Sequence, residues 1–288
     1  MQLLEASQAK LDVYLINLDG ADKRLEAMLK QLSVIGLSAQ RIEAVDGRKM
    51  PFPNPDFCAL SYGLLHGRRT SPPEVGCYLS HVECARTFMR GDADFALILE
   101  DDVTFADDFL RTIDDAICHA RNWDILRLTT VNSGRKFPFK DLSSSRKLAI
   151  SLTREKGAGA YIINRRAGRW ISTRLLPMRL AYDIAFDLEF LAGLKAAFVH
   201  PLCATQDADA NSQIQRNIRA YRLPGWRYLT VLPYRAYLET ARFLCRGALL
   251  AAYKTKYTAS APEAPPLTIA PAQKSGAEPV TSPESHPA

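Results

Sequence analysis

The chain has 288 residues, and its 47% hydrophobic and 24% charged content is typical of a folded globular protein. Its formal net charge of +6 initially suggests nucleic-acid binding, but residues 219–257 hold eight basic residues and one acidic residue. The remainder of the chain is therefore close to neutral, and nucleic-acid binding is the least favoured class of function.

The six cysteines form no closely spaced pair, which argues against a zinc site and against the disulfide framework of a small secreted domain. We therefore expect reduced cysteines and a cytoplasmic location. The first eight residues lack the basic and apolar regions of a signal peptide, and no apolar run of about 18 residues predicts a membrane span.

Strands and helices are predicted in alternation. Apolar runs predict strands at residues 11–18, 40–45, 95–99, 124–128, 147–153, 159–163 and 196–199. Helical spacing of apolar residues predicts helices at residues 25–35, 74–89, 107–121, 165–175 and 184–194. Residues 50–73 and 132–146 are predicted to be loops. The first strand, helix and strand form a βαβ unit, so we expect an α/β domain over residues 1–225 with a mixed sheet flanked by helices.

After this domain, residues 226–257 are predicted to form a basic amphipathic helix. Arg235, Glu239, Arg242 and Arg246 recur at helical spacing and form a polar stripe. The stripe has two interpretations, which are peripheral attachment to an anionic membrane surface and packing on its own domain or on a second subunit. The proline-rich residues 258–288 are predicted to be a disordered tail.

Three acidic residues, Glu100, Asp101 and Asp102, directly follow the apolar strand at 95–99. Side chains at the carboxyl end of a parallel strand face the crevice in which α/β folds bind ligands. Closely spaced carboxylates repel one another unless a cation joins them, and Mg²⁺ or Mn²⁺ would in turn bridge diphosphate oxygens. The alternative is a solvated acidic turn that caps the next helix.

Five short motifs occur in a fixed order: VYLINLD at 13–19 with Arg24, EAVDG at 43–47, EVGCYLSH at 74–81, LILEDD at 97–102 and GAYII at 159–163. Together they resemble glycosyltransferase family 25, the bacterial lipopolysaccharide and lipooligosaccharide galactosyltransferases and their collagen-modifying relatives. The resemblance covers roughly residues 11–214. It implies a GT-A-like (Rossmann-like) fold, a nucleoside-diphosphate-sugar donor, Mn²⁺ or Mg²⁺ as a cofactor, and inversion at the anomeric carbon.

The resemblance also gives roles to residues near the first two strands. Asn17 and Asp19 would lie near the nucleotide, and Arg24 would contact phosphate or fix that loop. Asp46 would contact the uridine or ribose. The alternatives are that Arg24 is an exposed residue of the first helical turn and that Asp46 only forms an Asp-Gly turn.

Further roles fall on the next helix and strand. Ser80 and His81 would face the donor, with Ser80 holding the strand-end carboxylates by a hydrogen bond. The alternative for His81 is a core histidine whose hydrogen bonds are satisfied. Glu100 and Asp101 would assist in binding the donor.

The metal is assigned to Asp102 and Glu100, with His200 as a further ligand and Asp207 as its rival. An inverting transfer needs a carboxylate that takes the proton of the acceptor hydroxyl, and Asp183 is the candidate base. The alternative is that Asp183 merely caps its helix. The late segment 212–214 also resembles the family.

These inferences predict an inverting, metal-dependent hexosyltransferase. We expect it to move galactose from a UDP-sugar to a lipid-linked saccharide, such as bacterial lipopolysaccharide, at the inner face of the bacterial inner membrane. The alternative function is a non-catalytic relative that binds a nucleotide sugar or a saccharide.

Overall fold

The computed structural model describes residues 2–132, 134–143, 145–206 and 221–259. Its strands are β1 (Gln2–Leu3), β2 (Lys10–Asn17), β3 (Gln40–Glu43), β4 (Phe95–Glu100), β5 (Val103–Phe105), β6 (Ile125–Arg127), β7 (Lys136–Asp141), β8 (Lys147–Ser151), β9 (Ala160–Asn164), β10 (Ala196–His200) and β11 (Ala204–Gln206). Its α-helices are α1 (Asp22–Val34), α2 (Ala59–Ser61), α3 (Pro72–Arg90), α4 (Phe109–Cys118), α5 (Arg165–Arg174), α6 (Tyr182–Phe186) and α8 (Tyr228–Ala259). The remaining helical turns are η1 (Gly47–Lys49), η2 (Tyr62–His66), η3 (Ala120–Asn122), η4 (Glu189–Ala192) and η5 (Gly225–Arg227).

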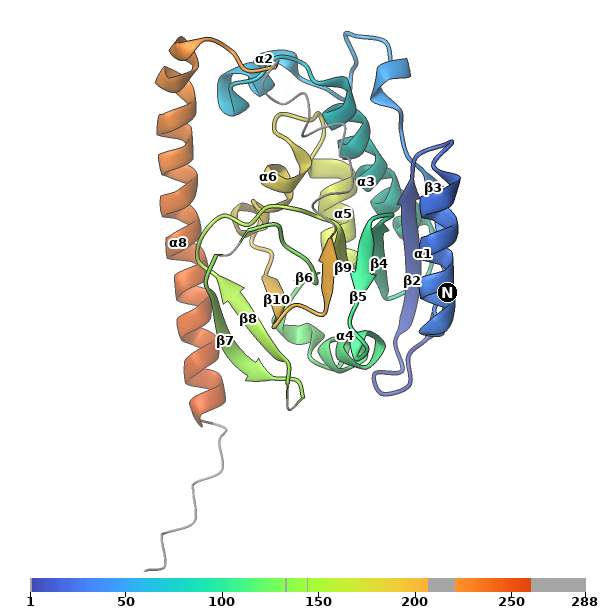
Figure 1. The fold of residues 1–288 in the computed structure, drawn as a ribbon. Coiled ribbons are helices and arrows are strands. Elements are labelled where there is room, and N and C mark those ends of the chain that lie inside the picture. Colours follow the sequence, from blue (N-terminus) through green and yellow to red (C-terminus); the bar gives the residue numbers. More distant parts are fainter. Residues whose placement is uncertain (1, 133, 144, 207–220, 260–288) are drawn as a thin grey trace, which may run out of the picture.

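Nine strands form one mixed sheet in the order β1-β2-β4-β9-β6-β10-β8-β7, with β3 also paired to β2 (Figure 1). Strands β3, β2 and β4 are parallel, whereas β9 runs antiparallel between β4 and β6. The second sheet is the short ribbon of β5 and β11. The mixed α/β sheet predicted from the sequence is therefore confirmed.

Apolar residues on both faces of the sheet explain its two helical layers. In β4, Leu97 and Leu99 contribute to a core with α1 and α4, whereas Ala96 and Ile98 contribute to a core with α3, α5 and α6. All four side chains are fully buried. Because alternate residues of a strand face opposite sides, β4 must be apolar throughout, and Glu100 is its first charged residue.

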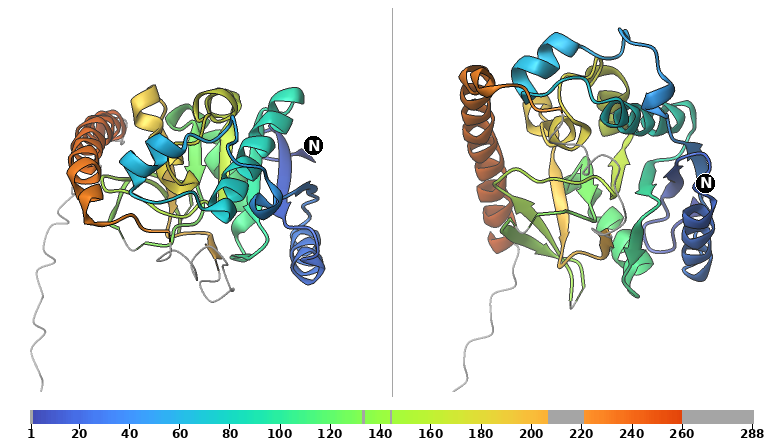
Figure 2. Two further views of the ribbon diagram at one scale, coloured as in Figure 1. Left: turned by 90° about the horizontal axis from the view of Figure 1, so that it is seen from above. Right: turned by 45° about the horizontal axis from the view of Figure 1, so that its top comes forward.

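Helix α8 lies at the side of the molecule opposite α1, along β7 and β8 (Figures 1 and 2). Two arginines of its polar stripe point inward. The Arg246 guanidinium lies 2.9 Å from Asp187 and 2.8 Å from Glu189, and that of Arg242 lies 3.0 Å from Asp187. Arg242 and Arg246 are therefore buried against their own domain and are unavailable to a membrane. Within the described residues, no helix combines the length and apolarity needed to cross a bilayer.

Some elements differ from the sequence predictions. The predicted loop at 50–73 contains α2 and η2 around the fully buried Tyr62. The predicted loop at 132–146 contains β7, whose alternation is interrupted by a bulge near Pro138. The helix predicted at 184–194 is divided into α6 and η4. Most of the predicted disordered tail, residues 260–288, lies outside the described residues.

Candidate functional site

The acidic triplet lies where β4 ends and the chain turns into β5. The β5–β11 ribbon places Gln206 opposite Val103, next to these carboxylates. Gln206 Nε2 lies 2.6 Å from Glu100 Oε2 and 3.1 Å from Asp102 Oδ1. A single amide nitrogen therefore occupies the space between two carboxylates. A small cation with oxygen ligands would take the same position between the two carboxylates.

Asp101 points away from this pair, toward β2 and α1. Its Oδ2 accepts a hydrogen bond from Asn17 Nδ2 at 2.7 Å, and its Oδ1 lies 3.1 Å from the Arg24 guanidinium. Burial raises the pKa of Asp101, and Asn17 and Arg24 oppose that rise. The structure thus brings together the predicted residues Asn17, Arg24 and Asp101. Both carboxylate oxygens of Asp101 are already engaged.

A buried hydrogen-bonded chain supports Glu100 from the side of α3. His81 Nε2 lies 3.1 Å from Glu100 Oε1, and His81 Nδ1 lies 3.0 Å from the Tyr161 hydroxyl. Tyr161 in turn contacts the Tyr182 hydroxyl at 2.9 Å. The imidazole also stacks on Tyr182, with ring centroids 4.1 Å apart and planes 3° apart. This chain connects the end of β4 to α6.

The two carboxylates joined by Gln206 have opposite pKa shifts. Burial favours the neutral form of Glu100, but hydrogen bonds from His81 and Gln206 outweigh it and lower the pKa of Glu100. Burial and the nearby charge of Glu100 raise the pKa of Asp102 to about 7. Asp102 is thus a carboxylate whose charge lacks a strong cationic partner. A bound divalent cation would reverse that shift.

Asp183 lies in the first turn of α6, directly after Tyr182. The residue at the N-cap is Ala181, so the structure does not support the interpretation that Asp183 is simply the helix cap. Burial raises the pKa of Asp183 despite the opposing charges of Arg127 and other basic residues.

The charge of Asp183 converges with those of Glu100 and Asp102 on one residue of α3. Burial raises the pKa of the Cys77 thiol, and the charges of Glu100, Asp183 and Asp102 add to this rise. Asp183, Glu100 and Asp102 therefore all lie close enough to Cys77 of α3 for their charges to act on its thiol.

The set of groups that could hold a metal is broader than the acidic triplet. Cys77, His81 and Glu100 each offer a ligand atom, and these atoms lie within 4.8 Å of one another. Both ring nitrogens of His81 already have hydrogen-bond partners, and Glu100 Oε1 is one of them. Glu100 Oε2 and Asp102 Oδ1 instead both contact the Gln206 amide nitrogen, which lies between the two carboxylates. The oxygen donors fit Mg²⁺ or Mn²⁺ better than a softer metal.

The predicted role of Ser80 must be corrected. Its hydroxyl accepts a hydrogen bond from the Val45 amide at 2.9 Å and donates one to the Gly76 carbonyl at 2.8 Å, so these contacts are with the loop after β3 and not with the acidic triplet. The same loop packs closely on α3, because a Cβ added to Gly76 would lie 2.2 Å from the Val45 carbonyl oxygen. The motifs at 43–47 and 74–81 therefore form one backbone-to-backbone contact.

Other predicted residues lie farther from the carboxylates. Asp46 caps η1 by accepting a hydrogen bond from the Arg48 amide, and its side chain pairs with the Arg48 guanidinium. Asp19 is largely exposed, with Arg41 at 3.7 Å. His200 ends β10, which is separated from β4 by β9 and β6. With strands about 4.8 Å apart, the sheet order does not bring His200 to Glu100.

The late segment that does reach the triplet is β11, through Gln206. Asp207, the rival of His200, lies outside the described residues, as does segment 212–214. Sequence reasoning overlooked Gln206 because no motif surrounds it. It also gave no role to Cys77 and Tyr161, although both lie within the quoted motifs.

A family model and individual relatives both match this chain. The family model of Glycosyltransferase family 25 (LPS biosynthesis protein) matches residues 10–186. A glycosyltransferase 25 family member of Anopheles gambiae is 29% identical over 126 residues, covering 40% of this chain and 21% of the relative. Procollagen galactosyltransferase 2 of Homo sapiens is 29% identical over 126 residues, covering 40% of this chain and 20% of the relative.

Catalytic competence differs among the similar proteins. An inactive glycosyltransferase 25 family member 3 of Mus musculus is 30% identical over 129 residues, covering 41% of this chain and 21% of the relative. The chain thus spans about a fifth of the length of these curated relatives.

Proposed function

This chain belongs to glycosyltransferase family 25. We propose that it transfers a hexose, specifically galactose, from a UDP-sugar to a saccharide with inversion at the anomeric carbon. The observation that carries the proposal is the pair Glu100 and Asp102 around Gln206 Nε2, with the charge of Asp183 acting on the same region. A purely structural acidic turn would not require the buried support of His81 and Tyr161.

In this proposal, Asp102 and Glu100 hold Mn²⁺ or Mg²⁺. When bound, such a cation supplies positive charge next to the leaving diphosphate. Asn17 and Arg24 fix Asp101 and so hold the turn in which the metal ligands lie. His81 holds Glu100 in place through Nε2, while Tyr161 and Tyr182 hold His81.

Asp183 is the proposed general base, which takes the proton of the acceptor hydroxyl as the sugar moves. A carboxylate with a raised pKa is a stronger base than an exposed one, and burial raises the pKa of Asp183. The base is ionised only above that raised pKa. Activity should therefore fall on the acidic side at a higher pH than for an exposed carboxylate.

The deciding experiment is a donor screen that measures nucleotide release with Mn²⁺, with and without EDTA. UDP-galactose is expected to be turned over, and EDTA should abolish turnover. Asp102→Asn should lower kcat/KM by at least about a hundredfold, the order of loss when a key transition-state contact is removed. The matched control is Asp107→Asn, an exposed carboxylate five residues later, which should retain full activity. Full activity of Asp102→Asn would disprove the metal assignment.

The alternative is a non-catalytic relative that binds a nucleotide sugar, a type represented by the inactive mouse protein. It predicts that UDP raises the melting temperature without release of nucleotide from any donor. The combination of a raised pKa at Asp102 and a supporting hydrogen-bonded chain at Glu100 favours the enzyme. A protein without turnover has no need to keep this repulsive pair.

For the acceptor, we propose a lipid-linked saccharide, with the protein in peripheral contact with an anionic membrane. The polar stripe predicted from the sequence cannot make this contact, because Arg242 and Arg246 are buried. The outward side of α8 instead presents Leu229, Tyr237 and Leu244 to solvent. Exposed apolar residues of this kind, with cations at the edges, are typical of helices that lie in a membrane interface.

A further inference from the structure

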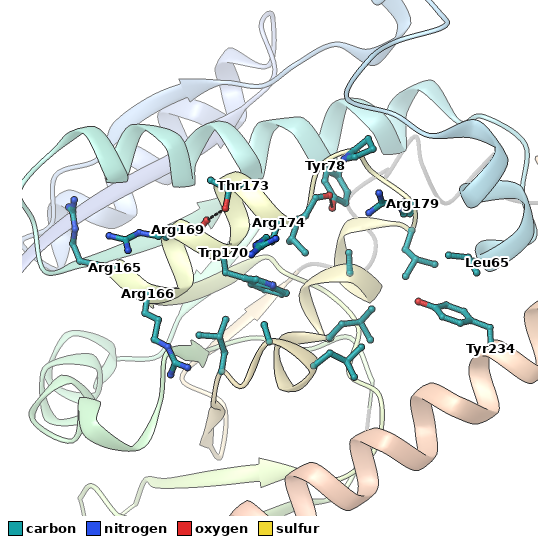
Figure 3. A pocket seen from close by; sticks show the side chains of 18 residues that line it. Leu65, Tyr78, Arg165, Arg166, Arg169, Trp170, Thr173, Arg174, Arg179 and Tyr234 are labelled. Atoms are coloured by element: carbon teal, nitrogen blue, oxygen red, sulfur yellow. Dashed lines mark hydrogen bonds between the residues drawn. The ribbon is translucent and has the colours of Figure 1, made fainter.

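A hollow of about 810 Å³ lies between α5, the segment from α6 to η4, and the first half of α8 (Figure 3). Its apolar lining includes Trp170 from α5, Leu188 and Leu191 from the α6–η4 segment, and Tyr234 from α8. None of Glu100, Asp101, Asp102, His81 or Asp183 lines it. The hollow is therefore distinct from the candidate active site, and its volume is within the range of ligand sites.

Five arginines also line this hollow, and among the residues that the structure describes no aspartate or glutamate does. Two of them already have partners. Arg165 donates to the carbonyl oxygens of Phe88 and Gly91, and Arg166 pairs with Asp124 at 3.2 Å.

Arg169, Arg174 and Arg179 differ from these two. All three side chains are exposed, and in the described part of the chain their guanidinium groups have no hydrogen bond or ion pair. The lining thus combines three uncompensated positive charges with an apolar floor.

We propose that this hollow is a binding site for an anionic lipid. The phosphate of the head group binds at the positively charged rim formed by Arg169, Arg174 and Arg179, and an acyl chain occupies the apolar floor beside Trp170 and Leu188. Guanidinium groups bind phosphate through paired hydrogen bonds, which explains arginines at the rim. A free phosphate would leave the apolar floor unused, and a neutral apolar ligand would leave the arginines uncompensated.

The position of the hollow suits a ligand that stays in a bilayer. Tyr234, which lines the hollow, belongs to the same helix as the exposed Leu229 and Leu232. A lipid could therefore enter beside the apolar side of α8. The site does not depend on glycosyl transfer, so loss of activity and loss of lipid binding can be observed separately.

The test uses the full chain with Trp226→Phe, so that Trp170 is the tryptophan at the hollow and the exposed Trp226 does not report. Quenching of its fluorescence is measured with vesicles of phosphatidylcholine, with and without 30% phosphatidylglycerol, in which the acyl chains of both lipids are brominated. We expect quenching only with the anionic vesicles. The triple variant Arg169→Gln/Arg174→Gln/Arg179→Gln should weaken binding at least tenfold.

A matched control, Lys23→Gln/Lys30→Gln/Arg111→Gln, removes the same charge from exposed positions outside the hollow. It should bind like the parent chain, and an equal loss in this control would overturn the proposal in favour of non-specific charge. Ala192→Phe, at an exposed position of the lining, should obstruct the hollow and also weaken binding without adding a tryptophan. Unchanged binding by Ala192→Phe would equally overturn it.

A competition experiment separates a lipid from a free phosphate. Dihexanoyl phosphatidic acid, which is soluble as a monomer, should displace the vesicles at concentrations at which inorganic phosphate has no effect. Equal competition by inorganic phosphate would show that the apolar floor contributes nothing, and the lipid assignment would fail. Circular dichroism of each variant checks that the fold is retained.

Discussion

At the scale of single residues, His81 shows how burial determines chemistry. Its side chain is 1% exposed, and both ring nitrogens have partners. Because a carboxylate only accepts hydrogen bonds, Nε2 must carry the proton that is donated to Glu100. His81 therefore has the satisfied hydrogen bonds of a core histidine and also supports a residue of the candidate site. We therefore assign His81 the role of a positioning residue, and Asp183 remains the proposed base.

A second buried histidine, His66, has no such partners, and this gives a prediction about pH. Burial and the charges of Arg68, Arg235 and Arg154 lower the pKa of His66 to about 3, and neither ring nitrogen has a hydrogen-bond partner among the described residues. In the unfolded chain its pKa is about 6.5. The unfolded state thus binds more protons below that value, and stability falls as the pH decreases from about 6.5 toward 3.

We therefore expect His66→Phe to remove part of the acid sensitivity. Between pH 8 and pH 5 the wild type should lose about 2 kcal/mol more unfolding free energy than the variant, because protonation of the unfolded imidazole no longer contributes. Urea denaturation of both proteins at the two pH values measures this difference. The half-buried His119 does not report on the same group, so the comparison is made between the wild type and His66→Phe alone. Parallel curves for the two proteins would show that His66 keeps an ordinary pKa in the fold.

At the scale of elements, the contact between the loop after β3 and α3 depends on two glycines. A Cβ on Gly76 would lie 2.2 Å from the Val45 carbonyl oxygen, and one on Gly47 would lie 1.7 Å from that of Pro72. Backbone atoms cannot move aside as a flexible side chain would. We expect Gly76→Ala to lower the unfolding free energy by at least about 2 kcal/mol, measured by urea denaturation.

Gly247 provides the control for this prediction. It lies within α8, and an added Cβ would meet nothing within 4 Å. Gly247→Ala should therefore raise stability by about 0.5–1 kcal/mol, since alanine is the better helix former. If both glycine substitutions changed stability in the same direction, the close approach at Gly76 would not be the cause.

The attachment of α8 to the domain gives a further prediction. Arg246 is buried between Asp187 and Glu189, with oxygens at 2.9 and 2.8 Å. Removing one partner of a buried ion pair leaves uncompensated charge and costs about 3–5 kcal/mol. We expect Arg246→Gln to destabilise the chain by that order, whereas the exposed Arg235→Gln should change stability by less than about 1 kcal/mol. Similar effects of the two substitutions in urea denaturation would contradict this assignment.

The sequence predicted those strands and helices whose apolar residues follow a regular local spacing. Strand β4 and helix α3 follow from an apolar run and from helical spacing, and the acidic triplet follows from its place after β4. The pairing of β11 with β5 could not be predicted, because it depends on residues about 100 positions apart. That pairing brings Gln206 to Glu100. Likewise, the pattern of α8 showed two different faces, but the acidic partners that turn Arg242 and Arg246 inward lie in another segment.

At the scale of the whole molecule, α8 presents an uncharged outward stripe. Leu229, Pro233, Tyr237, Thr240 and Leu244 recur at spacings of three or four residues, and all are exposed. A helix of 32 residues is roughly 48 Å long, so the stripe occupies a substantial part of one side of the protein. Exposed apolar surface of this extent is a feature of interaction sites.

We expect this stripe to contribute to membrane association without regard to charge. Leu229 and Leu244 are 80% and 63% exposed, so Leu229→Gln/Leu244→Gln should leave the fold intact. Burial of two leucines in the interface is worth more than about 1.4 kcal/mol, and the double variant should therefore bind vesicles at least about tenfold more weakly in a flotation assay.

Salt distinguishes the outward stripe of α8 from the arginines of the hollow. The factor by which the leucine substitutions weaken vesicle binding should be the same at low and at high salt. The factor by which the substitutions of Arg169, Arg174 and Arg179 weaken it should be largest at low salt. Wild-type vesicle binding by the double leucine variant would show that the outward side of α8 contacts something other than a membrane.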